Sequence, residues 1–334
     1  MSLLGANVLT LADWAKRLDP KGKVPSIVEL LSQSNQILDD MLWKEGNLPT
    51  GERTTVRTGL PTVAWRLLNQ GVQPSKSTTA QIDEGVGMLE AYSEVDKDLA
   101  ELNGNSASFR LSEAQAFIEA MNQEFASTLI YGNSGTAPEE FTGLAIRYSS
   151  LSAANGQNIV DCGGSDVSNS SSIYLVCWGA QTVHGIFPKG SKAGLIHEDL
   201  GLTTVETTAG VAGTRMRAYL DHWQWKCGVA LKDWRYVVRG ANIDISNLVA
   251  KSSAADLFDK MIKMIHRVPN LAMGRPVFYM NRTVFQELDI QRRDDVVAGG
   301  GLTYQNSDGV VKHSFRGIPV KIVDALLETE ARVV

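Results

Sequence analysis

The longest run of periodically spaced apolar residues predicts an α-helix over residues 112–131. Apolar residues recur there every three or four positions, which places them on one stripe of a helix. We expect Phe117, Met121 and Phe125 to be buried on this stripe. The stripe consists of Leu111, Ala114, Phe117, Ile118, Met121, Phe125, Ala126, Leu129 and Ile130.

Both ends of this helix carry residues typical of helix termini. Ser112 followed by Gln115 has the form of a capping box, which satisfies two backbone N–H groups at a helix start. Gly132-Asn133 is typical of a helix that ends in the left-handed conformation. The polar, glycine-containing residues 131–136 then predict a turn.

Two patterns predict β-strands in the middle of the chain. Residues 173–178 form a continuous apolar run, which is typical of a buried strand, and residues 183–187 are a suitable partner for it. Over residues 223–231 every second residue is apolar, which predicts a strand with one covered face. We expect residues 215–220 and 233–239 to extend the same sheet.

The C-terminal part combines one helix with two strands. Ser253 and Asp256 have the form of a cap for an amphipathic helix. The apolar segments 276–281 and 317–323 predict strands. We expect these two strands to share one sheet beside that helix, and not to lie in the sheet that carries Trp225.

The N-terminal residues 1–48 are predicted to form an arm of two short amphipathic helices. Asp19-Pro20 ends the first helix, Pro25 opens the second, and Gly46 ends it. Two roles stay open for such an arm: it docks on its own domain, or it reaches across to a neighbouring subunit.

Residues 49–87 form an excursion that is unusual inside a compact domain. Val63, Trp65 and Leu67 alternate with polar or small residues, which predicts a strand with one covered face. The polar residues 69–84 then predict a tip, after which the chain returns. Long excursions of this kind are typical of functional segments.

Six charged side chains of this excursion are candidates for contacts with another molecule. Three arginines lie on its stem, and the planar guanidinium group suits bidentate binding of a carboxylate. One lysine and two carboxylates are expected at its tip. The candidates are Arg53, Arg57, Arg66, Lys76, Asp83 and Glu84.

The composition favours an α+β protein with two globular parts. The chain has 334 residues, 43% of them hydrophobic, so it can bury a substantial core. Helical and strand-like segments occur in blocks and not in strict alternation. The net charge of −5, with scattered basic residues, argues against sequence-specific nucleic-acid binding. The three cysteines form no CxxC pair, and the sequence contains no secretory signal or membrane-spanning stretch.

No combination of residues predicts a catalytic, cofactor or metal site. The five histidines are scattered, without HExxH spacing, and neither a phosphate-binding loop nor a G-x-S-x-G motif is present. The adjacent carboxylates Glu139-Glu140 and Asp294-Asp295 are interpreted as solvated charge. The sequence therefore favours a non-enzymatic role.

Several segments resemble those of tailed-phage major capsid proteins. The helix over 112–131 with its glycine-rich exit resembles the spine helix and following turn of that family. Residues 59–66 (GLPTVAWR) resemble its extended E-loop, and residues 276–281 and 317–323 resemble two strands of its axial domain. The resemblance implies the Hong Kong 97-type (Johnson) fold. The axial-domain strands follow residues 223–239, an order similar to that of the epsilon15-like and Bordetella-phage-like branch of short-tailed phages.

This resemblance implies a division of the chain into successive structural segments. It implies an N-terminal arm at 1–48, an E-loop at 49–87, a peripheral domain with the spine helix at 88–147, loop and strands of unassigned domain at 148–200, long peripheral-domain strands at 201–245, and an axial domain at 246–334.

The resemblance also implies a function, that of a major capsid protein. Such a protein forms hexamers and pentamers of an icosahedral phage head around double-stranded DNA and is assembled in the host cytoplasm. The implied partners are its own copies, a decoration or cement protein, a scaffold, a portal and, non-specifically, the packaged DNA, with no cofactor and no membrane. The six charged residues become candidates for contacts between subunits. A cytosolic enzyme with an unrecognised site and a surface binding module stay open as alternatives. Assembly of the chain into shells would distinguish the capsid protein from both.

Overall fold

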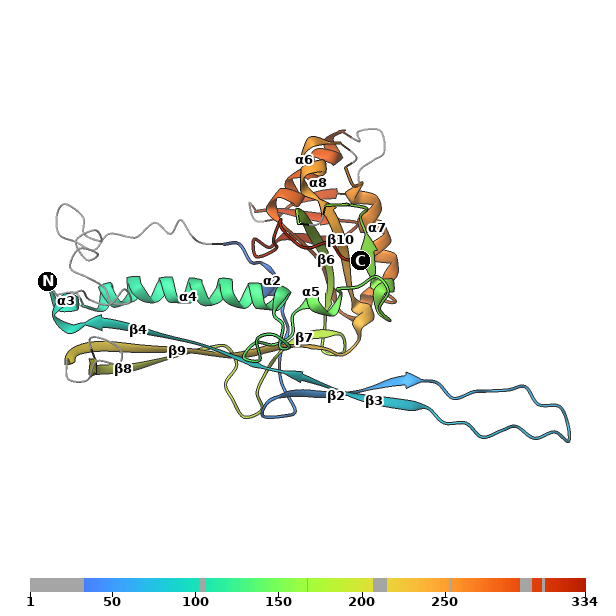
Figure 1. The fold of residues 1–334 in the computed structure, drawn as a ribbon, viewed down its shortest axis with the longest axis horizontal. Coiled ribbons are helices and arrows are strands. Elements are labelled where there is room, and N and C mark those ends of the chain that lie inside the picture. The colour runs from blue at the N-terminus through green and yellow to red at the C-terminus, as the bar shows by residue number, and fades with distance from the viewer. Residues whose placement is uncertain are drawn as a thin grey trace. The chain divides into compact units, whose positions relative to one another are not determined.

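The computed structural model divides the chain into two compact units (Figure 1). The small unit contains residues 88–126 and 194–226, and the large unit contains residues 34–87, 127–193 and 227–334. Helix α4 (Ser106–Tyr131) and strand β9 (Arg215–Leu231) contribute residues to both units. The structure describes residues 33–102, 106–166, 168–206, 215–252, 254–294, 302–307 and 310–334, so the arm predicted before residue 33 lies outside it.

The small unit contains a three-stranded ribbon. Strand β9 lies between β8 (Leu195–Glu206) and β4 (Gly87–Asp96). It pairs with β8 in antiparallel register, so that Trp225 lies opposite Leu195. The strand predicted over 223–231 is therefore confirmed, and residues 215–220 extend it as expected. Strand β8 was not predicted as a strand. Most of its residues are exposed, so its sequence lacks the apolar alternation that indicates a strand with one covered face.

Helix α4 begins six residues earlier than its apparent capping box. Phe109 is only 2% exposed and packs with Val95 and Ala100, so tertiary packing extends the helix back to Ser106. The Ser112 hydroxyl donates to the carbonyl of Phe109 within the helix and does not cap it. The predicted start at residue 112 is thus wrong.

The predicted apolar stripe of α4 is only partly buried. Met121 and Phe125 are buried, at 4% and 1% exposure, as predicted. Phe117 is half-buried, and Ile118 is 43% exposed. The ring of Phe125 packs against that of Trp225 with 4.5 Å between centroids, so the buried part of the helix covers the ribbon within the small unit.

Gly132 ends α4 for a different reason from the one predicted. It is not among the residues with a positive φ, so the predicted left-handed end is not formed. A Cβ atom at Gly132 would instead lie 2.5 Å from the carbonyl oxygen of Phe141 and 2.6 Å from that of Thr128. The glycine is required because the returning chain passes too close for any side chain.

The large unit is built on a mixed sheet. Its strand order runs β12 (Leu302–Ser307), β13 (Val310–Phe315), β14 (Ile318–Ile322), β11 (Arg275–Met280), β6 (Ser170–Trp178) and β7 (Val183–Phe187). Strand β11 pairs in parallel with β14 and antiparallel with β6, which confirms that the strands at 276–281 and 317–323 share a sheet. All nine residues of β6 are buried, including the apolar run 173–178 that predicts a buried strand.

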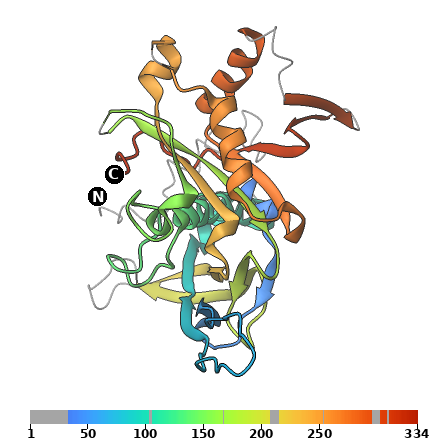
Figure 2. The same ribbon diagram turned by 90° about the vertical axis from the view of Figure 1, so that its right-hand side faces the viewer.

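Three helices pack against this sheet and enclose the core (Figure 2). They are α6 (Ile245–Ala250), α7 (Leu257–Arg267) and α8 (Arg282–Asp294). The side chain of Asp256 caps α7 by accepting from the backbone N–H of Asp259, as the capping pattern predicts. Ser253, its expected companion, lies outside the described residues.

The block of peripheral strands expected at 201–245 is divided between the two units. Residues 227–245 belong to the large unit, where β10 (Val237–Asp244) pairs with β6 and with β5 (Ile159–Asp161). Of residues 233–239, which were expected to extend the sheet of Trp225, only 237–239 are in a strand, and they belong to the same twelve-stranded sheet as part of β10 and not as a continuation of β9. β10 is buried along nearly its whole length, so it lies inside a core and not beside an exposed ribbon.

The expected separation of sheets is also wrong. β9 pairs with β7 through its last residues, with Gly228 opposite Ile186 and Leu231 opposite Val183. A single strand order therefore runs from β14 and β11 through β6 and β7 to β9, which carries Trp225. The length of β9 causes this difference, because one long strand contributes to both units.

The second N-terminal helix is much shorter than predicted within the described residues. Only Ile37–Asp40 (α2) are helical there, and Trp43–Glu45 form strand β1, which pairs in parallel with β7. Trp43 lies opposite Gly185, whose missing side chain makes room for the indole ring. Sequence periodicity could not reveal this pairing, because it depends on a glycine far along the chain.

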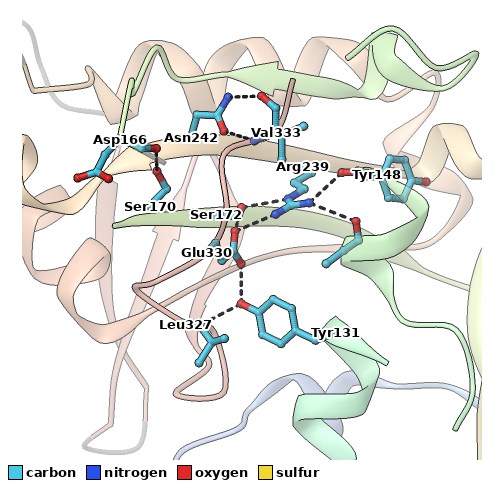
Figure 3. A network of polar contacts seen from close by, with 11 residues as sticks. Tyr131, Tyr148, Asp166, Ser170, Ser172, Arg239, Asn242, Leu327, Glu330 and Val333 are labelled. Carbon is cyan, nitrogen blue, oxygen red and sulfur yellow. Dashed lines mark hydrogen bonds and ion pairs between the residues drawn. The ribbon is translucent and has the colours of Figure 1, made fainter. Parts of the chain in front are cut away.

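A buried ion pair fixes the C-terminal tail to the core of the large unit (Figure 3). Arg239 on β10 donates to Glu330 in the tail at 2.8 Å, and their side chains are 5% and 4% exposed. Arg239 also donates to the Ser172 hydroxyl and to the carbonyl of Tyr148. Tyr131, at the end of α4, donates its hydroxyl to the second Glu330 oxygen at 2.5 Å. Both charged groups of the pair are thereby hydrogen-bonded to residues of other elements.

A second contact holds the end of the same tail. The side-chain amide of Asn242 donates to the carbonyl of Val333 at 2.9 Å and accepts from its backbone N–H at 2.8 Å (Figure 3). Asn242 has a φ of 61°, at a point where the pairing of β10 with β6 shifts register. Asparagine tolerates this left-handed conformation better than most residues, so the sequence suits the irregularity.

Candidate subunit interface

The excursion at 49–87 forms a two-stranded hairpin separate from the main sheet. Strand β2 (Gly51–Gly59) pairs with β3 (Thr78–Gly85) in antiparallel register, from Gly51 opposite Gly85 to Gly59 opposite Thr78. Figure 1 shows this hairpin projecting from the part of the large unit that contains β7. The prediction of an extended segment that returns is thus confirmed, but its strands lie at 51–59 and 78–85 and not at the alternating residues 63–67.

A buried polar cluster holds the root of β2. Glu52 is 5% exposed, and its carboxylate accepts from Lys232 at 2.9 Å and from Nε2 of His184 at 2.8 Å. Burial by itself raises the pKa of Glu52, but the hydrogen bonds from Lys232 and His184 outweigh it and hold this pKa below its usual value. Glu52 is therefore ionised at neutral pH and anchors β2 to β7 and to the end of β9.

A second ion pair holds the root of β3. Glu84 is 8% exposed and accepts two hydrogen bonds from Arg147, each of 2.5 Å. Arg147 closes the short helix α5 (Leu144–Arg147) and also donates to the carbonyl of Thr142. Such bidentate pairs are directional, so this one fixes where β3 leaves the body of the unit.

Arg53 and Asp83 link the two strands of the hairpin to each other. Nε and Nη2 of Arg53 donate to the two oxygens of Asp83, at 2.6 and 2.7 Å. This interaction lowers the pKa of Asp83, first through the hydrogen bond from Arg53. Asn47 adds two hydrogen bonds to the backbone of Arg53. Arg53 and Asp83 therefore stabilise the hairpin itself.

The six predicted contact residues consequently fall into two groups. Glu84 and Asp83 do not lie at the tip, as expected, but in β3 near the root. Both are paired within the chain, as is Arg53, because strand pairing and the fold bring their partners next to them. The other three, Arg57, Arg66 and Lys76, are exposed and lie outside these pairs.

The connection between β2 and β3 is apolar where sequence analysis predicted a strand with a covered face. Residues 60–77 contain no strand, and Trp65 is fully exposed. Val63, Trp65 and Leu67 are apolar at every second position, but no part of the described chain covers their side chains. The exposed fractions are 80% for Leu60, 88% for Val63, 104% for Trp65, 70% for Leu67 and 89% for Leu68.

The described residues carry few groups suited to other chemistry. Among them, no three histidine, cysteine or carboxylate side chains are arranged to hold a metal ion. No helix in the described ranges has the length and apolarity needed to cross a membrane. The three cysteines are buried thiols, and burial raises the pKa of each to about 12. His184 is committed to Glu52.

Comparison with known proteins assigns the chain to a family. Residues 19–334 match the family described as major capsid protein GP7. The capsid structure of bacteriophage Epsilon15 matches with a TM-score of 0.80 and 31% identity, over 100% of this chain and 99% of that chain. No curated protein matches.

More distant solved structures include two other capsids. The capsid of bacteriophage JBD30 matches with a TM-score of 0.47 and 10% identity, over 89% of this chain and 92% of that chain. The capsid of a native GTA particle matches with a TM-score of 0.46 and 10% identity, over 67% of this chain and 95% of that chain. The Epsilon15 likeness confirms the α+β fold of Hong Kong 97 type and the resemblance stated from sequence. The chain belongs to the major capsid protein GP7 family and is a non-enzymatic structural protein of the phage head shell.

Proposed function

We propose that copies of this chain assemble into hexamers and pentamers of an icosahedral head enclosing double-stranded DNA, and that the β2–β3 hairpin of each copy lies over an adjacent subunit. The hairpin itself supports this proposal. An isolated two-stranded ribbon is at best marginally stable in water, so its outer part gains order from a neighbour. Its two roots, at Glu52 and Glu84, are instead fixed by buried ion pairs within the chain.

The exposed cations of the hairpin provide part of the proposed contact. Arg57, Arg66 and Lys76 face carboxylates of the adjacent subunit in this proposal, because the arginine fork binds a carboxylate bidentately. One exposed ion pair contributes little. A closed symmetric shell repeats the same contact at every equivalent position, so small contributions add up.

The two compact units also have proposed counterparts in the shell. We assign the small unit to the peripheral domain and the helices α6, α7 and α8 with their sheet to the axial domain. The hairpin corresponds to the E-loop and α4 to the spine helix. Further proposed partners are a decoration or cement protein, a scaffold, a portal and, non-specifically, the packaged DNA, with assembly in the host cytoplasm.

Expression of the chain alone tests the proposal. Negative-stain microscopy is expected to show shells or capsomers, and native mass spectrometry is expected to show hexamers and pentamers. A discrete small species at all protein concentrations would contradict self-assembly through these contacts.

Charge reversal tests the hairpin contact separately. Arg57→Glu combined with Lys76→Glu is expected to leave the melting temperature of the unassembled subunit nearly unchanged and to lower the shell yield in a salt-dependent way. Arg53 stays unchanged, because it is paired within the hairpin. A normal shell yield at every salt concentration would show that these cations do not bind a neighbour.

A further inference from the structure

The residues that join β2 to β3 form an uncovered apolar surface. Five large apolar side chains between residues 60 and 68 are each at least 70% exposed, and Trp65 is completely exposed. Single exposed apolar residues are ordinary on protein surfaces, but a contiguous group of this kind marks an interaction site. We define residues 60–68 as the apolar tip.

The apolar tip has a defined backbone course. The Ser75 hydroxyl donates to the carbonyl of Thr62 at 2.7 Å, which joins the two sides of the connection. Thr58 and Thr78 share a hydrogen bond of 3.1 Å where the strands end. The backbone N–H of Gln70 donates to the carbonyl of Leu67 at 3.2 Å. The tip thus presents its apolar side chains outward instead of packing them on its own strands.

We propose that the apolar tip is a hydrophobic anchor that packs against a second copy of this chain, with Trp65 at its centre. The inference rests on the proposed placement of the hairpin over an adjacent subunit, and it names the chemistry of that contact. Tryptophan and arginine are enriched among the residues that dominate interface energies, and Arg66 directly follows Trp65. In this arrangement, the ion pairs between the hairpin cations and the adjacent subunit set the orientation of the hairpin. Burial of the apolar tip contributes most of the binding free energy.

A second copy fits this surface better than a nucleic acid does. Within the apolar tip, Arg66 is the only charged residue, whereas nucleic-acid surfaces rely on clustered cations. Apart from the exposed pair of Arg53 with Asp83, the exposed charges on the hairpin are Arg57, Arg66 and Lys76, which are all basic. They complement a chain with 37 acidic and 32 basic residues. The tip also continues the same projecting hairpin that carries these cations.

A hydrophobic anchor differs measurably from an ion-pair contact. Salt screens exposed ion pairs, with a screening length of about 10 Å at 0.1 M, but it does not weaken apolar burial. Loss of Trp65 is therefore expected to lower assembly at low and at high salt. Loss of Arg66 is expected to lower it at low salt only.

The experiment compares Trp65→Ala with two matched variants. Arg66→Gln removes the neighbouring charge, and Val249→Ser changes an exposed apolar residue on α6, far along the chain from the hairpin. Trp65→Ala is expected to leave the melting temperature of the unassembled subunit unchanged. It is expected to reduce the shell yield by about tenfold or more at low and at high salt. Val249→Ser is expected to assemble like the wild type.

A photo-crosslinking amino acid at position 65 identifies the partner. In wild-type-like shells it is expected to crosslink to a second copy of this chain. Normal shell yield for Trp65→Ala, or crosslinks only to another protein, to lipid or to nucleic acid, would overturn the anchor. Failure of the wild-type chain to form any shell would instead contradict the proposed function, so the two failures are distinguishable.

Discussion

Glu84 and Arg147 are joined by two hydrogen bonds of 2.5 Å, although 63 residues separate them in the chain. Glu84 belongs to the projecting hairpin, and Arg147 belongs to a short helix of the body of the same unit. Their side chains are 8% and 15% exposed, so the pair is largely shielded from water. Glu84, which was expected at the tip of the hairpin, therefore fixes the root of the hairpin to the body of the unit.

Removal of the Glu84 carboxylate is expected to destabilise the subunit. Glu84→Ala leaves Arg147 buried without its partner, which typically costs about 3–5 kcal/mol. Urea unfolding of the unassembled subunit measures this loss. Asp83→Ala, the adjacent residue, is the matched control: its ion pair is exposed, so a much smaller change is expected. Equal effects of the two substitutions would show that burial does not determine the strength of these pairs.

The pair between Arg239 and Glu330 predicts a role for the C-terminal tail in stability. Burial is the main cause that raises the pKa of Tyr131, and the negative charge of Glu330 is the second. The Tyr131 hydroxyl therefore stays protonated and donates to the Glu330 carboxylate. Glu330→Ala is expected to cost about 3–5 kcal/mol, because Arg239 stays buried without a counter-charge.

A double substitution separates loss of the tail contact from loss of charge balance. Arg239→Met with Glu330→Leu removes both charges together, and replacement of a buried pair by apolar residues is often nearly neutral. The double variant is therefore expected to melt at a higher temperature than Glu330→Ala. A double variant that is less stable than the single one would mean that the hydrogen bonds to Ser172 and Tyr148 matter more than the charges.

Phe125 predicts how the small unit depends on α4. Its side chain is 1% exposed and packs against Trp225, so Phe125→Ala leaves a cavity that typically costs about 3–5 kcal/mol. We expect insoluble subunits, measured as the soluble fraction after expression. Ile118→Ala, on the same helix and 43% exposed, is expected to stay soluble. A soluble, monodisperse Phe125→Ala protein would contradict the prediction.

The cluster of Glu52 and His184 predicts destabilisation by acid in two steps. Burial lowers the pKa of His184 below its ordinary 6.5, so the unfolded chain binds more protons as the pH falls below 6.5 and stability decreases. Glu52, with a pKa held below 4.5, contributes stability that is lost when the pH falls below 4.5. Each group can change the free energy of unfolding by at most about 1.4 kcal/mol per pH unit.

Melting temperatures between pH 7.5 and 5, a range set around the ordinary pKa of about 6.5, test the first step. His184→Gln keeps an N–H donor for Glu52 but cannot titrate, so a flatter pH profile is expected. His266→Gln is the matched substitution of an exposed histidine. A His184→Gln profile as steep as that of the wild type would assign the acid sensitivity to other groups.

Local patterns in the sequence predicted several of the longer elements that form here. The helical stripe of α4, the alternation of β9 and the continuous apolar run of β6 each reflect a repeat that the backbone geometry itself imposes. The same local signals located the strands β11 and β14, but they placed the strand of the hairpin around residues 63–67 instead of at 51–59 and 78–85. Joined to a family resemblance, they were sufficient to predict the fold and the role in a capsid.

The errors lie where distant residues decide the outcome. Phe109 extends α4 beyond its apparent cap through packing, and Gly132 is selected by the passing carbonyl of Phe141 instead of by its own dihedral angle. The length of β9, which contributes to both units, divided a block of strands that looked continuous in the sequence.

Only the tertiary structure separated the candidate contact residues of the hairpin. Glu84 and Arg53 read alike in the sequence as charged residues of a projecting segment, but the fold brings Arg147 to one and Asp83 to the other. The alternation around Trp65 likewise shows that one face is apolar without showing what covers it. A period in the sequence determines which side chains share a face, whereas the partner of that face is determined by residues far away in the chain or in another copy.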